Sequence, residues 1–134
     1  MILKLFLALN ILTTVFQPFI SQRIPITSSK PEIISIYTDY PIDGTWVQIP
    51  KGTKKITFYV DAENTETVLF WLIPTGTQTW ADRKLIGYDI RENQTDNKFT
   101  LTWKIDLPCL HDHLYIQAIG EEIVEQEVFN LYME

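Results

Sequence analysis

The chain has 134 residues, of which 46% are hydrophobic, and a formal net charge of −6 at pH 7. This length is enough for one packed core and too short for two ordinary domains. The acidic balance argues against a nucleic-acid partner, because such binding depends largely on Lys and Arg that neutralise phosphates. The one basic cluster, Lys51, Lys54 and Lys55, lies at a predicted turn, where we expect solvated side chains.

The first twenty residues differ from the rest of the chain. Lys4 is their only charged side chain, and residues 5–20 are mostly apolar. A short basic start followed by an apolar stretch is typical of a secretory signal peptide. We therefore predict a signal peptide over residues 1–21, a linker over 22–32 and one domain over 33–134, in a secreted or cell-surface protein. The alternatives are a retained membrane anchor, for which the apolar run is only marginally long, and a buried first element of the domain.

Cysteine usage adds one point about the compartment. Cys109 is the only cysteine, so no disulfide can form within the chain. Export without disulfides fits a bacterial surface or secreted protein better than a small eukaryotic secreted scaffold.

From residue 33 onward, short apolar runs alternate with turn residues. In the segments 55–61 and 99–105, hydrophobic side chains occupy every second position, which is the pattern of a half-buried strand. We predict eight strands, at residues 33–37, 45–49, 55–61, 67–73, 85–90, 99–105, 113–119 and 123–132. Their spacing, with long loops between the fourth and sixth strands, predicts an all-β, immunoglobulin-like Greek-key β-sandwich of seven to eight strands.

Four runs of sequence carry a family resemblance: ITFYVDAENTETVLFWLIPTGT, KLIGYDI, FTLTWKI and HLYIQAIG. Together they resemble the bacterial immunoglobulin-like domains of secreted enzymes and surface proteins. The matching elements are Val68 with Phe70, then residues 85–87, 99–103 and 115–118. The resemblance covers residues 32–132 and implies the fold, together with a role as a spacer or binding module. The segment PCLHDH departs from the family, which usually has Gly and Tyr there.

No set of residues predicts catalysis. The four serines lie outside any strand-to-helix elbow, and the apolar neighbours of Cys109 disfavour its thiolate. The carboxylates fall mostly at strand ends, without a calcium-loop pattern and without a selected pair. We therefore expect a non-catalytic binding module without a cofactor. A small carbohydrate-active or metal-dependent enzyme on the same sandwich is the alternative.

Cys109, His111 and His113 form a weak candidate metal set. Residues two apart in an extended segment face the same side, so the three could converge on a zinc ion. A proline precedes Cys109 and interrupts the alternation, and no fourth ligand is identifiable. We therefore predict a loop with two solvent-facing imidazoles and no bound metal.

The segment 67–73 is apolar on both faces, so one set of its side chains must pack in the core and the other must be covered. We expect Trp71 in the core, as the tryptophan found on the third strand of such sandwiches, with Phe70 and Leu72 facing outward. In the alternative arrangement, Trp71 and Tyr115 share a partly apolar outer sheet face.

The loop after this segment carries Trp80, which we expect to pack over the sheet or stand at its rim. Partner contacts are then predicted around Trp71, Trp80 and Tyr115. The predicted partner is a protein or a cell-wall carbohydrate, and self-association through the outer sheet face is a further possibility. Membrane association is expected only if the N-terminal segment is retained.

Overall fold

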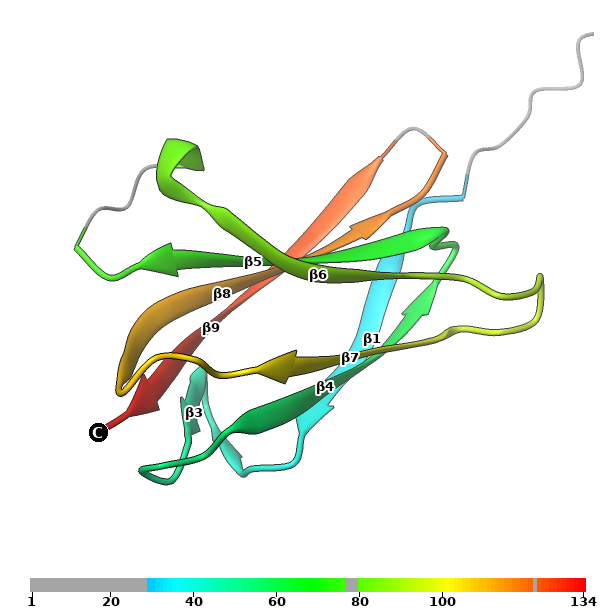
Figure 1. Cartoon of the computed structure of the whole chain (residues 1–134). Helices are drawn as coiled ribbons and strands as arrows, with labels where there is room; N and C mark the ends of the chain where they lie inside the picture. The colour runs from blue at the N-terminus through cyan, green and yellow to red at the C-terminus, as the bar shows by residue number, and fades with distance from the viewer. Residues whose placement is uncertain (1–28, 77–79, 122) are drawn as a thin grey trace, which may run out of the picture.

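The computed structural model describes residues 29–76, 80–121 and 123–134. Within these residues the chain forms nine strands and one 3-10 turn (Figure 1). The elements are β1 (Glu32–Thr38), β2 (Ile42–Asp43), β3 (Trp46–Gln48), β4 (Lys55–Glu63), β5 (Thr67–Pro74), η1 (Trp80–Asp82), β6 (Lys84–Ile90), β7 (Lys98–Lys104), β8 (Leu110–Ile119) and β9 (Val124–Met133). In the described part of the chain, no helix is both long and apolar enough to span a bilayer.

The strands form two sheets that pack against each other. One sheet has the order β1-β4-β7 and the other the order β2-β3-β9-β8-β5-β6. In an immunoglobulin-like sandwich, strands A, B and E share one sheet, and strands C, F and G share the other. Strands β1, β4 and β7 take the first set of places and β5, β8 and β9 the second. The predicted all-β, immunoglobulin-like sandwich is confirmed, with one strand more than the upper count expected.

The additional strand and one strand boundary differ from the sequence-based prediction. Ile42 of β2 pairs with Val47 of β3. β2 lies in a segment rich in Asp, Pro and Gly, a composition that predicts a turn. β8 begins at Leu110, three residues before the predicted strand. The segment around His111 is therefore paired with β9 and is not the loop that we expected.

The core lies between the two sheets and follows the predicted alternation in β4 and β7. Ile56, Phe58 and Val60 of β4 are buried, as is Phe99 of β7. Trp103 also faces inward but is only half-buried, packed against the margin of the core. The regular alternation of these strands is enough to fix which face is buried, because their other face is polar.

The expectation for β5 is wrong by one residue. Phe70 is fully buried and Leu72 is 6% exposed, both in the core, whereas Trp71 is half-buried on the outer face. The pairing with β8 explains this choice, because Phe70 lies opposite Ile116 and Trp71 opposite Tyr115. A slip of one residue would exchange the two faces of β5 and break these matched pairs.

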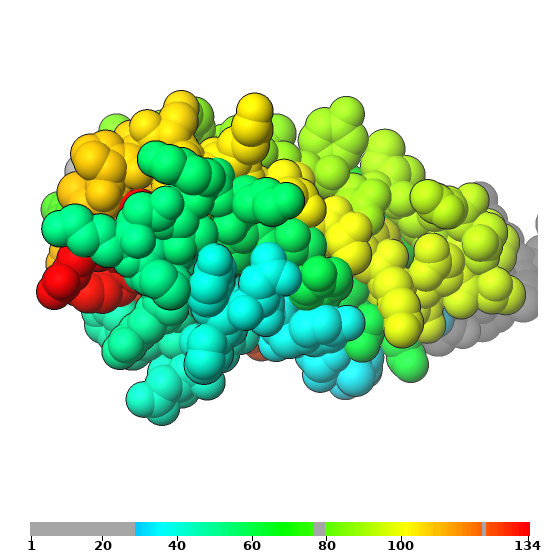
Figure 2. Space-filling view, turned by 60° about the horizontal axis from the view of Figure 1, so that its bottom comes forward, coloured from blue at the N-terminus to red at the C-terminus, as the bar shows by residue number. Residues whose placement is uncertain are grey.

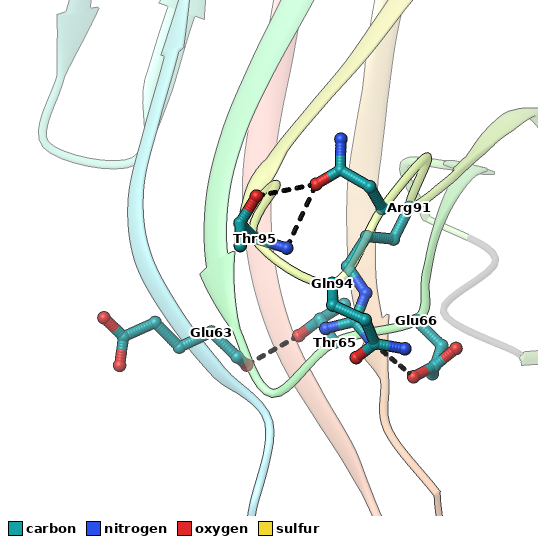
Figure 3. Close-up of polar contacts among 7 residues, drawn as sticks. Glu63, Thr65, Glu66, Arg91, Gln94 and Thr95 are labelled. Carbon is teal, nitrogen blue, oxygen red and sulfur yellow. Dashed lines mark hydrogen bonds and ion pairs between the residues drawn. The ribbon is translucent and has the colours of Figure 1, made fainter.

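A polar network joins two loops at one end of the sandwich (Figure 3). Arg91 Nη2 lies 2.6 Å from Glu66 Oε1, and the Arg91 backbone N–H donates to the Glu66 carbonyl at 2.9 Å. Nearby, the Thr65 hydroxyl donates to the Glu63 carbonyl at 2.9 Å. The loop after β6 is thereby fastened to the turn between β4 and β5.

The residues just before β1 already contact the sandwich, although the sequence places them in a linker. Lys30 Nζ lies 2.8 Å from Glu125 Oε2, and Pro31 is buried. The predicted signal peptide, residues 1–21, and the linker up to residue 28 lie outside the described residues.

Gly120, in the turn after β8, leaves no space for a side chain. A Cβ atom there would lie 2.8 Å from the Asn64 carbonyl oxygen and 3.1 Å from Pro31 Cδ, and neither atom can move without shifting backbone or ring. We expect Gly120→Ala to lower the free energy of unfolding by about 1–3 kcal/mol, measured by urea titration. Glu121→Ala, at the exposed neighbouring position, should stay within about 0.5 kcal/mol. Equal effects of the two substitutions would show that the turn is loosely packed.

Candidate functional site

The outer face of the six-stranded sheet is free of formal charge over strands β5, β8 and β9. The strand register assigns the outward positions, because they alternate with the core residues. These positions are Thr67, Leu69, Trp71 and Ile73 on β5, His111, His113, Tyr115, Gln117 and Ile119 on β8, and Val124, Gln126, Val128, Asn130 and Tyr132 on β9. None of them is Asp, Glu, Lys or Arg. We call this surface the apolar face.

The outer face of the three-stranded sheet has a different composition. Figure 2 looks onto this side of the molecule, where β1 (cyan), β4 (green) and β7 (yellow) lie side by side. Its outward positions on β4 and β7 are Lys55, Thr57, Tyr59, Asp61, Lys98, Thr100, Thr102 and Lys104. This is the solvated face that an antiparallel sandwich is expected to have. An outer face without charged residues is therefore found on the six-stranded sheet and not on the three-stranded sheet.

Trp71, Trp80 and Tyr115 form an aromatic cluster on the apolar face. The Trp80 ring centre lies 5.9 Å from that of Trp71 and 5.4 Å from that of Tyr115, with the Tyr115 ring nearly perpendicular to it at 72°. These separations are those of favourable aromatic pairs. The predicted packing of Trp80 over the sheet is confirmed. The role of the three residues in binding stays a prediction.

Arg83 holds this cluster together. Its guanidinium carbon lies 4.7 Å from the Trp71 ring centre and 4.6 Å from the Trp80 ring centre, within range of cation–π attraction to both. Arg83 Nη1 also donates to the Trp80 carbonyl at 2.7 Å. Arg83 Nε is buried and has no hydrogen-bond partner among the described residues. Burial of an unpaired donor costs free energy, which the stacking of the guanidinium on the two indole rings must offset.

A row of neutral polar groups crosses the apolar face beside the cluster. The Trp71 indole Nε1 donates to Gln117 Oε1 at 2.8 Å, and Gln117 Nε2 donates to Gln126 Oε1 at 3.2 Å. The indole N–H is therefore satisfied without a charged group. This row spans three adjacent strands and leaves the Gln126 side chain exposed.

The edge strand β6 extends the apolar face with exposed side chains. Tyr88 lies opposite Leu69, and Leu85 lies opposite Trp71. Leu85, Tyr88 and Ile90 are 42%, 59% and 58% exposed. Sequence analysis did not single out Arg83, Gln117 or Tyr88. The alternation of Leu85, Tyr88 and Ile90 is interrupted by the bulge opposite Phe70 and Trp71, so their common face could not be predicted.

The weak metal candidates are separated in the structure. Cys109 is exposed and precedes β8, His111 is exposed on β8, and half-buried His113 points to the neighbouring strand. The His113 Nδ1 atom lies 2.7 Å from Asn130 Oδ1, a hydrogen bond within the apolar face. Among the described residues, no three His, Cys, Asp or Glu side chains are grouped closely enough to hold a metal ion. The expectation of two solvent-facing imidazoles is wrong for His113.

Asp112, between these histidines, faces the opposite side of β8. Burial raises the pKa of its carboxyl above the usual value of 3.8, although a hydrogen bond from the His111 backbone N–H opposes the shift. A raised pKa in the folded state means that ionised Asp112 costs stability at pH above that pKa. This cost disappears once the pH falls below the pKa that the Asp112 carboxyl has in the unfolded chain.

The Asp112→Asn substitution should remove this cost. We expect the variant to have a higher Tm than the wild type near pH 7, and the difference should shrink as the pH falls to about 3. Thermal unfolding followed by circular dichroism at the two pH values provides the measurement. A difference in Tm that is the same at both pH values would contradict the buried-carboxyl explanation.

Comparison of the sequence with protein-family models and with curated proteins gave no match. The apolar face is therefore the feature of the structure that bears on function.

Proposed function

We propose that this chain is an exported, non-catalytic binding module that docks a partner protein on the apolar face. One observation carries the proposal: two tryptophans, a tyrosine and the loop residue Arg83 gather on a sheet face whose strand positions on β5, β8 and β9 carry no formal charge. The centres of protein–protein interfaces are depleted of Lys, Asp and Glu and enriched in aromatic residues and Arg. Trp, Tyr and Arg are also the residues that most often dominate binding free energy.

The aliphatic part of the face favours a protein partner over a glycan. Sugar platforms present flat aromatic faces, whereas here the Trp80 and Tyr115 rings already pack edge to face against each other. The most exposed large side chains nearby include Ile90 and Val124, at 58% and 50%. A second copy of the chain and a cell-wall carbohydrate are the other occupants that the experiments below would detect.

Export rests on the N-terminal sequence, and the family proposal rests on the resemblance to bacterial immunoglobulin-like domains. When the full chain is expressed in a secreting host, we expect it outside the cytoplasm and shortened by roughly 20 to 30 residues, as intact-mass measurement would show. Full-length protein retained in the cytoplasm would contradict the signal peptide.

The test of the binding face compares two exposed tyrosines on opposite sides of the sandwich. Tyr88 beside the apolar face is 59% exposed, and Tyr37 on β1 is 47% exposed. In the producing organism, the wild-type chain and the Tyr37→Asp variant should sediment as a complex. The Tyr88→Asp variant should sediment as the free chain, because a buried unpaired carboxylate disrupts an apolar interface. Identical sedimentation of both variants would refute the proposed face.

A further inference from the structure

An open pocket of about 500 Å³ lies at one end of the three-stranded sheet, away from the apolar face. Its lining residues are Asp39, Tyr40, Thr53, Lys54, Lys55 and Lys104. In Figure 2, the start of β4 (green) and the end of β7 (yellow) meet at this end of the molecule. The sequence shows Lys54 and Lys55 as part of a turn, and the fold adds Lys104 from a strand almost fifty residues later.

The strand register brings the three lysines together. Lys55 and Lys104 are directly opposite in the antiparallel pair β4–β7. Lys54 is fixed beside them, because its carbonyl accepts a hydrogen bond from the Ile105 N–H at 2.8 Å. Like charges directly opposite on neighbouring strands repel each other and destabilise the sheet. The pairing of Lys55 with Lys104 therefore does not stabilise the fold. The chain has a net charge of −6, so it has many carboxylates that could have been placed opposite these lysines.

The three lysines have no ion-pair partner within residues 29–76, 80–121 and 123–134. By contrast, Lys30 and Arg91 each form an ion pair with a glutamate. The carboxylate that lines the pocket is held toward β4. Asp39 Oδ2 accepts from the Thr57 N–H at 2.8 Å, and Asp39 Oδ1 lies 3.4 Å from the Tyr59 hydroxyl. Asp39 is thereby bonded to neutral donors, and the three lysines are exposed to solvent.

We propose that this pocket binds the phosphate group of a small phosphorylated ligand. Lysine ammonium groups bind phosphate as point charges, and each can donate up to three hydrogen bonds to phosphate oxygens. All three cationic groups here are lysines. The volume of the pocket is in the range of small-molecule sites. The site would be independent of the partner protein proposed for the apolar face.

The test is calorimetric titration of the purified full chain with inorganic pyrophosphate at low, constant ionic strength, since salt screens exposed charges. We expect saturable binding to the wild type and weaker binding of citrate, a carboxylate anion. The double variant Lys55→Gln, Lys104→Gln should bind pyrophosphate about tenfold more weakly. Its far-UV circular dichroism should match that of the wild type.

Lys98→Gln is the matched control. Lys98 lies at the opposite end of β7 from Lys104 and is paired with Asp61. Its substitution therefore removes one positive charge without touching the pocket. It should leave pyrophosphate binding unchanged. Three results would overturn the proposal: no saturable binding to the wild type, an equal loss in Lys98→Gln and in the double variant, or citrate binding as tight as pyrophosphate binding.

Discussion

Replacing Phe70 with alanine should lower the free energy of unfolding by about 3–5 kcal/mol. Phe70 is fully buried, and its ring stacks on that of Phe58 from the opposite sheet, with 6.0 Å between centres. Truncation would remove this contact between the sheets and leave a cavity in the centre of the core. Chemical denaturation followed by tryptophan fluorescence gives the value directly.

The neighbouring residue Trp71 supplies the control for this prediction. Trp71→Ala should cost less than Phe70→Ala, because Trp71 is half-buried on the outer face and is covered mainly by Trp80 and Arg83. A slipped register, with Trp71 in the core, would reverse the order. If Trp71→Ala proved the more destabilising substitution, the assigned faces of β5 would be wrong.

Replacing Trp80 with alanine should weaken partner binding by about thirtyfold or more, as expected for an interfacial tryptophan whose truncation costs about 2 kcal/mol. The free energy of unfolding should fall by only about 1 kcal/mol, because Trp80 is 39% exposed and lies outside the core cluster. Binding is measured on the complex isolated from the producing organism.

Trp46 on β3 is a matched control for Trp80. It is also an exposed tryptophan, at 44%, and it lies opposite Asn130 at the far margin of the apolar face, on the side of β9 away from β8. Trp46→Ala should leave partner binding within about twofold of the wild type. Equal losses in both variants would mean that the aromatic cluster is not the centre of the interface.

Polar neighbours decided how much of the fold could be predicted. The faces of β4 and β7 follow from the sequence because Thr and Lys alternate with their apolar residues. In β5 both faces are apolar, and only the pairing partner separates them. The outward positions of β8 include His113 and Gln117, which would have marked Trp71 as outward once the register was known.

The candidate site was predictable in part. Trp80 is a large aromatic residue in the loop beside β5, a strand with apolar side chains on both faces. One of these faces must be covered outside the core, so Trp80 could be placed near Trp71 and Tyr115. Arg83 could not be predicted, since its position against two indole rings depends on the closure of the turn at η1. The lysine pocket depends on pairing between distant strands, which the local pattern around Lys54 does not show.

The most direct test of the binding face is photocrosslinking in the producing organism. A photoreactive phenylalanine analogue replaces Tyr88 beside the apolar face or Tyr37 on the opposite sheet, and the irradiated products are separated by mass. Crosslinking at Tyr88 should give a discrete protein adduct, identified by mass spectrometry, and crosslinking at Tyr37 should give none. An adduct formed through Tyr37 alone, or no protein adduct at Tyr88, would contradict the proposal that the apolar face docks a partner protein.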